Sequence, residues 1–124
     1  RAVADRLVQT AVVRFGGLDS LINNAGVGTF VHVADMKVED WDRLIATNLT
    51  GVFLCTKAAI PALEQRGGGW IINISSLAGR NSFAGGAAYC ASKAGLNAFA
   101  ESLMLEVRQH NIRVSTVMPG SVQT

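Results

Sequence analysis

Apolar residues recur at helical spacing in three long segments of the chain, residues 2–15, 38–66 and 86–110. Such spacing places the apolar side chains on one face of a helix. The expected core-facing stripes are Val3, Leu7, Val8, Ala11, Val12 and Phe15 in the first segment, Trp41, Leu44, Ile45, Leu49, Val52, Ala59 and Leu63 in the second, and Leu96, Phe99, Leu103 and Val107 in the third. Glycines follow the first two segments and Asn111 follows the third, and these residues favour helix ends. The pattern therefore predicts three helices.

Three short apolar runs, residues 18–23, 70–74 and 112–117, each follow one of these helical segments. Short apolar runs that alternate with helices are typical of buried strands in a parallel sheet. We therefore predict an α/β fold with a doubly wound parallel sheet, in which helices cover both faces. The chain contains no internal repeat or low-complexity linker that would divide it into two domains.

The composition describes a globular chain of 124 residues that is 49% hydrophobic and carries a formal charge of +2. Its charges are scattered, and no basic run is interleaved with aromatic residues, so neither nucleic acid nor a membrane surface is an expected partner. No apolar stretch is expected to reach the length of a membrane span. The two cysteines, Cys55 and Cys90, lack the spacing of a zinc site or a redox pair. We therefore expect no metal site, and a reducing, cytoplasmic environment.

Small or hydrogen-bonding residues follow all three predicted strands. The first strand leads into Asn-Asn-Ala-Gly at 23–26, the second into Ser75 and Ser76, and the third into Pro119 and Gly120. The carboxyl ends of parallel strands share one edge of a sheet, and ligands of open α/β sheets bind beyond that edge. The functional site is therefore expected there.

Tyr89 and Lys93 are four positions apart in the third predicted helix, so the phenol and the ammonium project from the same face. A free tyrosine has a pKa of about 10 and is almost fully protonated at neutral pH. A neighbouring cation favours the phenolate, so Lys93 is expected to make Tyr89 a more effective acid. The same spacing is common where a ring simply lies beside a solvated charge. The pair therefore needs support from other motifs.

Five motifs supply that support: Asn-Asn-Ala-Gly (23–26), Asn-Leu-Thr-Gly (48–51), Ile-Asn-Ile-Ser-Ser (72–76), Tyr-Cys-Ala-Ser-Lys (89–93) and Pro-Gly-Ser-Val-Gln-Thr (119–124). In this order they resemble the short-chain dehydrogenase/reductase family, specifically its single-domain branch that includes 3-oxoacyl-[acyl-carrier-protein] reductases. The resemblance spans nearly the whole chain, and the ordered set is far more specific than any one motif. Ser76 stands thirteen positions before Tyr89, as in the family, which selects Ser76 over Ser75 as the catalytic serine.

The resemblance implies an oxidoreductase that transfers a hydride between NAD or NADP and a ketone or secondary alcohol. It implies that Tyr89 is the general acid and base, that Ser76 hydrogen-bonds the substrate oxygen, and that Lys93 holds the nicotinamide ribose. The implied cofactor contacts are Asn24, Ala25, Gly26, Tyr89, Lys93, Pro119, Gly120, Val122 and Thr124. By analogy within the family, a 3-oxoacyl thioester is the first substrate to consider.

The family also implies that Asn48 is catalytic, as the anchor of a water-linked proton path through the lysine. Its setting fits this role, because Thr47, Asn48, Thr50 and Gly51 are poor helix formers in the middle of a predicted helix. Local distortions of a helix often mark functional sites.

The sequence contains no glycine-rich turn that leads from a strand into a helix, the usual grip on the phosphates of a dinucleotide. In the family this turn follows the first strand, together with the residue that selects NAD or NADP. Residues 1–124 are therefore expected to be the central catalytic segment of a single NAD(P)-binding Rossmann-like domain that is incomplete at both ends. Family members assemble as dimers and tetramers, which implies a homo-oligomer, such as a homotetramer, formed through helices 38–66 and 86–110.

Two other classes of function remain open. Sugar epimerases and dehydratases of the family's extended branch share the tyrosine and lysine spacing, although segments 23–26 and 119–120 argue against them. A non-catalytic interaction module on the same fold is the second alternative. Single residues also have ordinary structural roles open to them, with Asn48 as a solvent-facing polar interruption and Ser76 as a cap.

Overall fold

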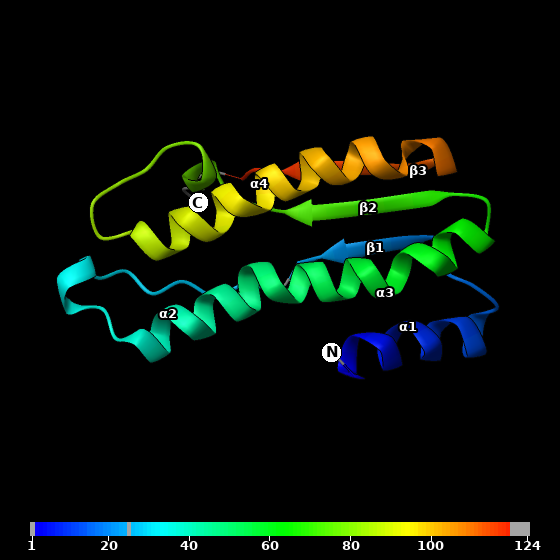
Figure 1. The fold of residues 1–124 in the computed structure, drawn as a ribbon, viewed down its shortest axis with the longest axis horizontal. Coiled ribbons are helices and arrows are strands. Elements are labelled where there is room, and N and C mark those ends of the chain that lie inside the picture. Colours follow the sequence, from blue (N-terminus) through cyan, green and yellow to red (C-terminus); the bar gives the residue numbers. More distant parts are fainter. Residues whose placement is uncertain (1, 25, 120–124) are drawn as a thin grey trace, which may run out of the picture.

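The computed structural model describes residues 2–24 and 26–119, in which helices and strands alternate (Figure 1). In chain order the elements are α1 (Ala2–Phe15), β1 (Ser20–Asn23), η1 (Val33–Asp35), α2 (Val38–Ile45), η2 (Ala46–Thr50), α3 (Gly51–Gln65), β2 (Gly69–Ile74), η3 (Leu77–Gly79), α4 (Ala87–Val107), η4 (Arg108–His110) and β3 (Ile112–Val117). The element η2 is a π-helical turn, and the other η elements are short 3-10 helices. The three predicted helices and three predicted strands are confirmed.

The strands form one parallel sheet in the order β1-β2-β3. β1 pairs with β2 along its whole length, and β2 and β3 pair along theirs. The segments that follow β2 and β3 also meet, because Ser75 N donates to Val117 O at 2.7 Å and Leu77 N donates to Pro119 O at 3.2 Å. The predicted parallel α/β sheet, with its strand exits on one edge, is confirmed.

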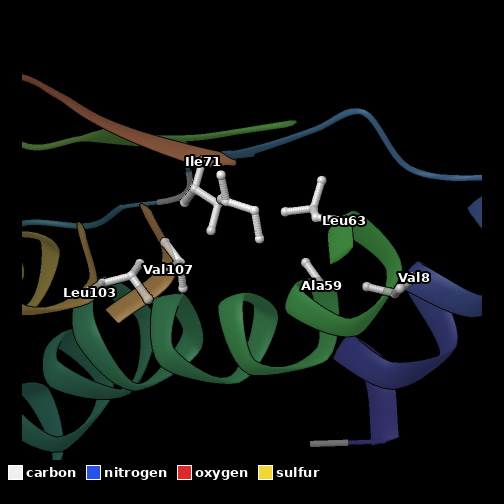
Figure 2. Packing of buried hydrophobic residues seen from close by; sticks show 7 residues of the cluster. Val8, Ala59, Leu63, Ile71, Leu103 and Val107 are labelled. Carbon is white, nitrogen blue, oxygen red and sulfur yellow. The ribbon is translucent and has the colours of Figure 1, made fainter. Parts of the chain in front are cut away.

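The helices of the described residues lie on one face of this sheet (Figures 1 and 2). α3 contacts β1 and β2, α4 contacts β3, and α1 packs on α3. On the opposite face Ile22, Trp70 and Val117 are exposed. The doubly wound arrangement predicts helices on that face as well, and the described part of the chain places none there.

The hydrophobic core lies between the sheet and the helices, where Figure 2 shows Ile71 pointing from the sheet into the helical layer. The buried cluster consists of Val8, Ala59, Leu63, Ile71, Leu103, Val107 and Ile112. Five of these positions lie on the predicted helical stripes, which confirms the phase of all three helices.

The predicted stripes are wrong for Val3, Leu7, Phe15 and Trp41, which are exposed. Helix α1 packs along a narrow line, where Ala4 and Val8 are buried and Val12 packs against the core cluster, whereas Val3, Leu7 and Phe15 remain exposed. Trp41 lies on α2, which extends past the ends of the strands in Figure 1. Periodicity reports which face of a helix is apolar, and the width of the buried stripe depends on how many neighbours cover it.

The predicted helix at 38–66 consists of α2, η2 and α3, which run end to end from Val38 to Gln65. By length and composition alone this 28-residue segment could cross a membrane, because it contains an 18-residue window with a mean hydropathy of 1.3. The expectation that no apolar stretch reaches that length is therefore wrong. Its buried residues Ala59 and Leu63 belong to the core cluster beneath the sheet. The C-terminal part of the segment therefore packs into the core.

Candidate active site

A cavity of about 760 Å³ lies at the edge of the sheet where the three strands end. Its walls come from the segments that follow β1, β2 and β3 and from the first turns of α4. Six residues predicted for the site line it: Asn24, Gly26, Ser76, Tyr89, Lys93 and Pro119. Ala25, Gly120, Val122 and Thr124 lie outside the described residues. The fold thus gathers into one cavity residues that are far apart in the sequence.

Tyr89 and Lys93 lie on the same face of α4, as their spacing predicts. The Lys93 Nζ atom is 5.7 Å from the centroid of the Tyr89 ring and donates a hydrogen bond of 3.2 Å to Ile74 O at the end of β2. Lys93 is only 5% exposed. This burial lowers the pKa of the Lys93 ammonium from its usual value near 10.5, because the charged form loses hydration. The cation is therefore held at a fixed place between the sheet and the phenol.

The two neighbouring serines, Ser75 and Ser76, have different surroundings. Ser75 is buried, and its hydroxyl donates to Lys93 O at 3.4 Å, which links the end of β2 to α4. Ser76 is less buried, and its Oγ accepts a hydrogen bond of 3.1 Å from Ala78 N as the cap of η3. Because Oγ acts as an acceptor in this cap, its hydroxyl hydrogen is available to a ligand in the cavity. Ser76 thus caps η3, the structural role considered from the sequence. Its hydroxyl also offers a hydrogen-bond donor to the cavity that Tyr89 lines.

Asn48 is completely buried, so it is not a solvent-facing interruption of the helix. Its Oδ1 accepts from Val27 N at 2.8 Å, and its Nδ2 donates to Val27 O at 2.8 Å and to Ser92 Oγ at 3.2 Å. Ser92 Oγ in turn donates to Tyr89 O at 2.8 Å. Asn48 therefore ties the loop after β1 to the part of α4 that carries Tyr89.

The π-helical turn η2 contains Asn48, which confirms the distortion predicted from the poor helix formers at this place. Gly26 lies close by, since a β-carbon at that position would come within 3.5 Å of both Asn48 Oδ1 and Lys93 Nζ. The loop after β1 thus passes directly over the buried amide and the ammonium. A larger residue at 26 would contact both groups.

The end of the sheet beneath the cavity is polar on its helical face. Asn23 Nδ2 donates to Asn73 Oδ1 at 2.8 Å and to Thr56 Oγ1 at 3.4 Å. Asn23 and Asn73 are register partners in β1 and β2. These buried contacts join the ends of two strands to α3.

Sequence reasoning missed two aromatic residues of the cavity wall, Phe30 and Phe83. Both lie in segments without helical or strand periodicity, so no pattern assigns them a direction. The available signal is that each large ring lies within a few positions of a site motif, Phe30 after Gly26 and Phe83 before Tyr89. Ser92 was also missed as the hydrogen-bond partner of Asn48, although it lies within the motif 89–93.

Comparison with known proteins gives consistent matches. The family model described as short chain dehydrogenase matches residues 1–124. A trans-4-hydroxycyclohexanecarboxylate dehydrogenase from Sinomonas cyclohexanicum is 49% identical over 117 residues, which cover 94% of this chain and 45% of that protein. A 3-oxoacyl-[acyl-carrier-protein] reductase from Synechocystis sp. is 41% identical over 120 residues, which cover 97% of this chain and 49% of that protein. The chain thus spans about half the length of these curated relatives.

A solved structure with the same fold is that of a metagenomic short-chain oxidoreductase in complex with NADP. It matches with a TM-score of 0.91 and 48% sequence identity, over 98% of this chain and 55% of that one. The likeness extends across every described helix and strand, and the Rossmann-like class predicted from the sequence is confirmed. Because the family model covers the whole sequence, this chain belongs to the short-chain dehydrogenase family.

Proposed function

We propose that residues 1–124 are the central catalytic segment of a single NAD(P)-binding Rossmann-like domain. The full natural polypeptide then acts as an NAD(P)-dependent oxidoreductase that transfers a hydride between the nicotinamide and a ketone or secondary alcohol. The observation that carries the proposal is that Ser76, Tyr89 and Lys93 line one cavity at the strand exits. Relatives named as a dehydrogenase and a reductase, and a similar oxidoreductase in complex with NADP, support it.

Lys93 can hold a nicotinamide dinucleotide in the cavity, because its ammonium has hydrogen-bond donors that the described residues leave free. An ammonium has three N–H donors, and among the described residues Ile74 O is the one acceptor that Lys93 Nζ reaches. Two donors therefore remain for neighbouring hydroxyls such as those of a ribose. We assign the other cofactor contacts to Tyr89 and to two groups of residues, Asn24, Ala25 and Gly26, and Pro119, Gly120, Val122 and Thr124. Of these, Asn24, Gly26, Tyr89 and Pro119 line the cavity. When bound, the nicotinamide supplies or accepts the hydride, and either NAD or NADP meets these requirements.

The proton and the developing charge are handled by the chain's own residues. Tyr89 gives its phenolic proton to the carbonyl oxygen during reduction and takes a proton from the alcohol during oxidation. The Ser76 hydroxyl donates to the same oxygen and stabilises the negative charge that develops on it. Lys93, held by Ile74 O at 3.2 Å, favours the phenolate that remains after proton transfer. Each role uses a group that lines the cavity.

Asn48 supports this machinery from behind the cavity wall. Its two contacts with the main chain of Val27 and its contact with Ser92 hold the loop after β1 against α4. We propose that Asn48 is a positioning residue for Lys93 and for the loop that contacts the cofactor. Its part in a water-linked proton path, implied by the family resemblance, stays a prediction.

We also propose that the full polypeptide is a cytoplasmic homo-oligomer, a dimer or a homotetramer, that acts on small molecules and binds neither nucleic acid nor a membrane. Both cysteines, Cys55 and Cys90, are free thiols, as a reducing compartment would keep them. Phe53 on α3 and Met104 on α4 expose apolar surface on the helices expected to pair.

The test of the proposed function uses the purified full natural polypeptide with NADH or NADPH and a panel of ketones. We expect oxidation of one or both cofactors that depends on the ketone. Tyr89→Phe should lower kcat by about 10²- to 10⁴-fold, the usual contribution of a positioned acid. Cofactor affinity should change little, because the ring is retained. Conversion of a nucleotide sugar without net cofactor turnover would instead identify an epimerase, and failure to bind either cofactor would identify an interaction module.

Ser76→Ala should also lower kcat, by about 10²- to 10³-fold if its hydroxyl stabilises the developing oxyanion. Ser82 provides a matched control, because it is an exposed serine in the following loop that does not line the cavity. Ser82→Ala should therefore leave turnover unchanged. Equal effects of the two substitutions would remove Ser76 from the catalytic role.

A further inference from the structure

Three aromatic rings form one side of the cavity, and we call Phe30, Phe83 and Tyr89 the aromatic wall. The Phe30 and Tyr89 centroids are 5.4 Å apart with an interplanar angle of 56°, and the Phe30 and Phe83 centroids are 6.1 Å apart at 29°. Each ring comes from a different segment: the loop after β1, the loop before α4, and α4 itself. Phe30 therefore lies between the predicted acid and the outer ring.

The two phenyl rings of the wall are exposed and face the cavity. Phe30 is 61% exposed and Phe83 is 47% exposed, and both line the cavity. Burial of such a ring is worth about 1.5–3 kcal/mol, so two open rings beside a catalytic residue leave apolar surface available to a ligand.

Close main-chain contacts hold both rings in place. A β-carbon at Gly28 would come within 2.8 Å of the Phe30 ring and 3.5 Å of Tyr89, so Phe30 lies directly on the backbone there. A β-carbon at Gly86 would overlap the Phe83 ring. A larger residue at either position would displace the neighbouring phenyl ring, Phe30 beside Gly28 or Phe83 beside Gly86. Each phenylalanine of the wall thus packs on a glycine, Phe30 on Gly28 and Phe83 on Gly86.

The charge of the cavity points to the same kind of ligand. Among the described residues that line it, Lys93 is the one charged side chain, and its ammonium lies near Tyr89 and Ile74. The other lining residues are apolar or neutral and include Leu77, Ala78 and Asn81. Because this one cation lies beside Tyr89, a carboxylate or phosphate packed against Phe30 and Phe83 would find no cation at those two rings, whereas a neutral ring would pack against them.

We propose that Phe30 is a specificity-determining residue and that the substrate is a ketone or secondary alcohol with a planar, uncharged ring next to the reacting carbon. The inference rests on the proposed function, because the reacting oxygen is placed by Ser76 and Tyr89. The substrate ring then packs on Phe30, beside Tyr89, with Phe83 at its outer edge. Reduction needs only the hydride of the nicotinamide and the proton of Tyr89, so no further reactant is required. This class differs from the 3-oxoacyl thioester suggested by family analogy.

The test compares two methyl ketones of the same carbon skeleton, acetophenone and 1-cyclohexylethanone, with the full natural polypeptide. Their intrinsic reactivities differ, so the measured quantity is the ratio of kcat/KM for acetophenone to that for 1-cyclohexylethanone in each variant. An aromatic pair contributes about 0.5–1.5 kcal/mol beyond its buried area, which corresponds to a fall of about 2- to 12-fold in this ratio for Phe30→Leu. Phe15→Leu is the matched control, because Phe15 is an exposed phenylalanine on α1 outside the cavity, and it should leave the ratio unchanged.

The outcomes separate this inference from the proposed function. A lower ratio for Phe30→Leu alone supports the aromatic wall as the specificity determinant. Turnover of both ketones with the same ratio in wild type and Phe30→Leu overturns the inference and leaves the proposed function intact. Absence of ketone-dependent turnover across the whole panel overturns both. If Phe30→Leu does not fold, Phe83→Leu decides, with the same direction expected and an unchanged ratio as the overturning result.

Discussion

Replacement of Asn48 by alanine should weaken both the fold and the grip on the cofactor. The side chain makes three hydrogen bonds, two to the main chain of Val27 and one to Ser92. Each contributes about 0.5–1.5 kcal/mol net, and the cavity left by the buried amide adds about 1 kcal/mol. Val27 is exposed, so its freed main-chain groups regain water and part of the loss is recovered. We therefore expect the free energy of unfolding to fall by about 2–4 kcal/mol.

The assay is urea unfolding of the full natural polypeptide, combined with steady-state kinetics. Because Asn48 holds the loop that passes over Lys93, KM for the dinucleotide should rise more than kcat falls. Asn48→Asp should be at least as destabilising near neutral pH, since it buries a charge and removes the donor to Val27 O. Its stability should recover partly as the pH falls and the carboxyl becomes neutral, which alanine cannot show.

The matched control is Gln65→Ala, an exposed position at the end of the same helix, which should change stability by no more than about 0.5 kcal/mol. A loss for Asn48→Ala no greater than that of the control, with unchanged KM for the dinucleotide, would refute the positioning role. A loss of stability without any kinetic change would show that the contacts are structural only.

Two further predictions concern Lys93 and the outer helices. Burial lowers the pKa of Lys93, so the folded state binds fewer protons than the unfolded state between that lowered value and about 10.5. In urea unfolding at several pH values, the stability of wild type relative to Lys93→Met should therefore rise with pH through this window. A pH-independent difference in stability would contradict the lowered pKa. The full polypeptide should have the mass of a dimer or tetramer in light scattering. Phe53→Glu or Met104→Glu should lower that mass, because both side chains are exposed on the helices expected to pair. A monomeric mass for wild type would contradict the proposed assembly.

The fold was largely predictable because its elements are encoded locally. Helix α1 ends where Gly16 adopts a positive φ of 82°, and η4 ends where Asn111 adopts a φ of 61°, as residues favoured at such ends predict. Which apolar residues become buried depends instead on the neighbours that each helix meets. Leu7 belongs to the same predicted stripe as the buried Val8 and yet is exposed, because it lies about 100° from Val8 around the helix and outside the line along which the described residues pack on α1.

The site likewise contains residues that local sequence patterns predict and residues that they do not. Ser76, Tyr89 and Lys93 were predictable because strand ends and helical spacing fix where they lie, and the cavity contains all three. Phe30 and Phe83 were not, because their directions are set by contacts between two irregular loops. No periodicity encodes such a contact.

The π-helical turn η2 changes which positions of the helix 38–65 become buried. Buried residues in this helix recur every four positions at Leu44, Asn48, Val52 and Thr56. Four residues advance about 400° in an α-helix, so three such steps would rotate the buried line by about 120°. A π turn accommodates one extra residue, or about 100°, and so cancels most of this drift. The π turn therefore keeps these four positions on one buried line, and it explains why a polar amide lies on the same line as the core of the helix, facing the loop and α4 that it joins.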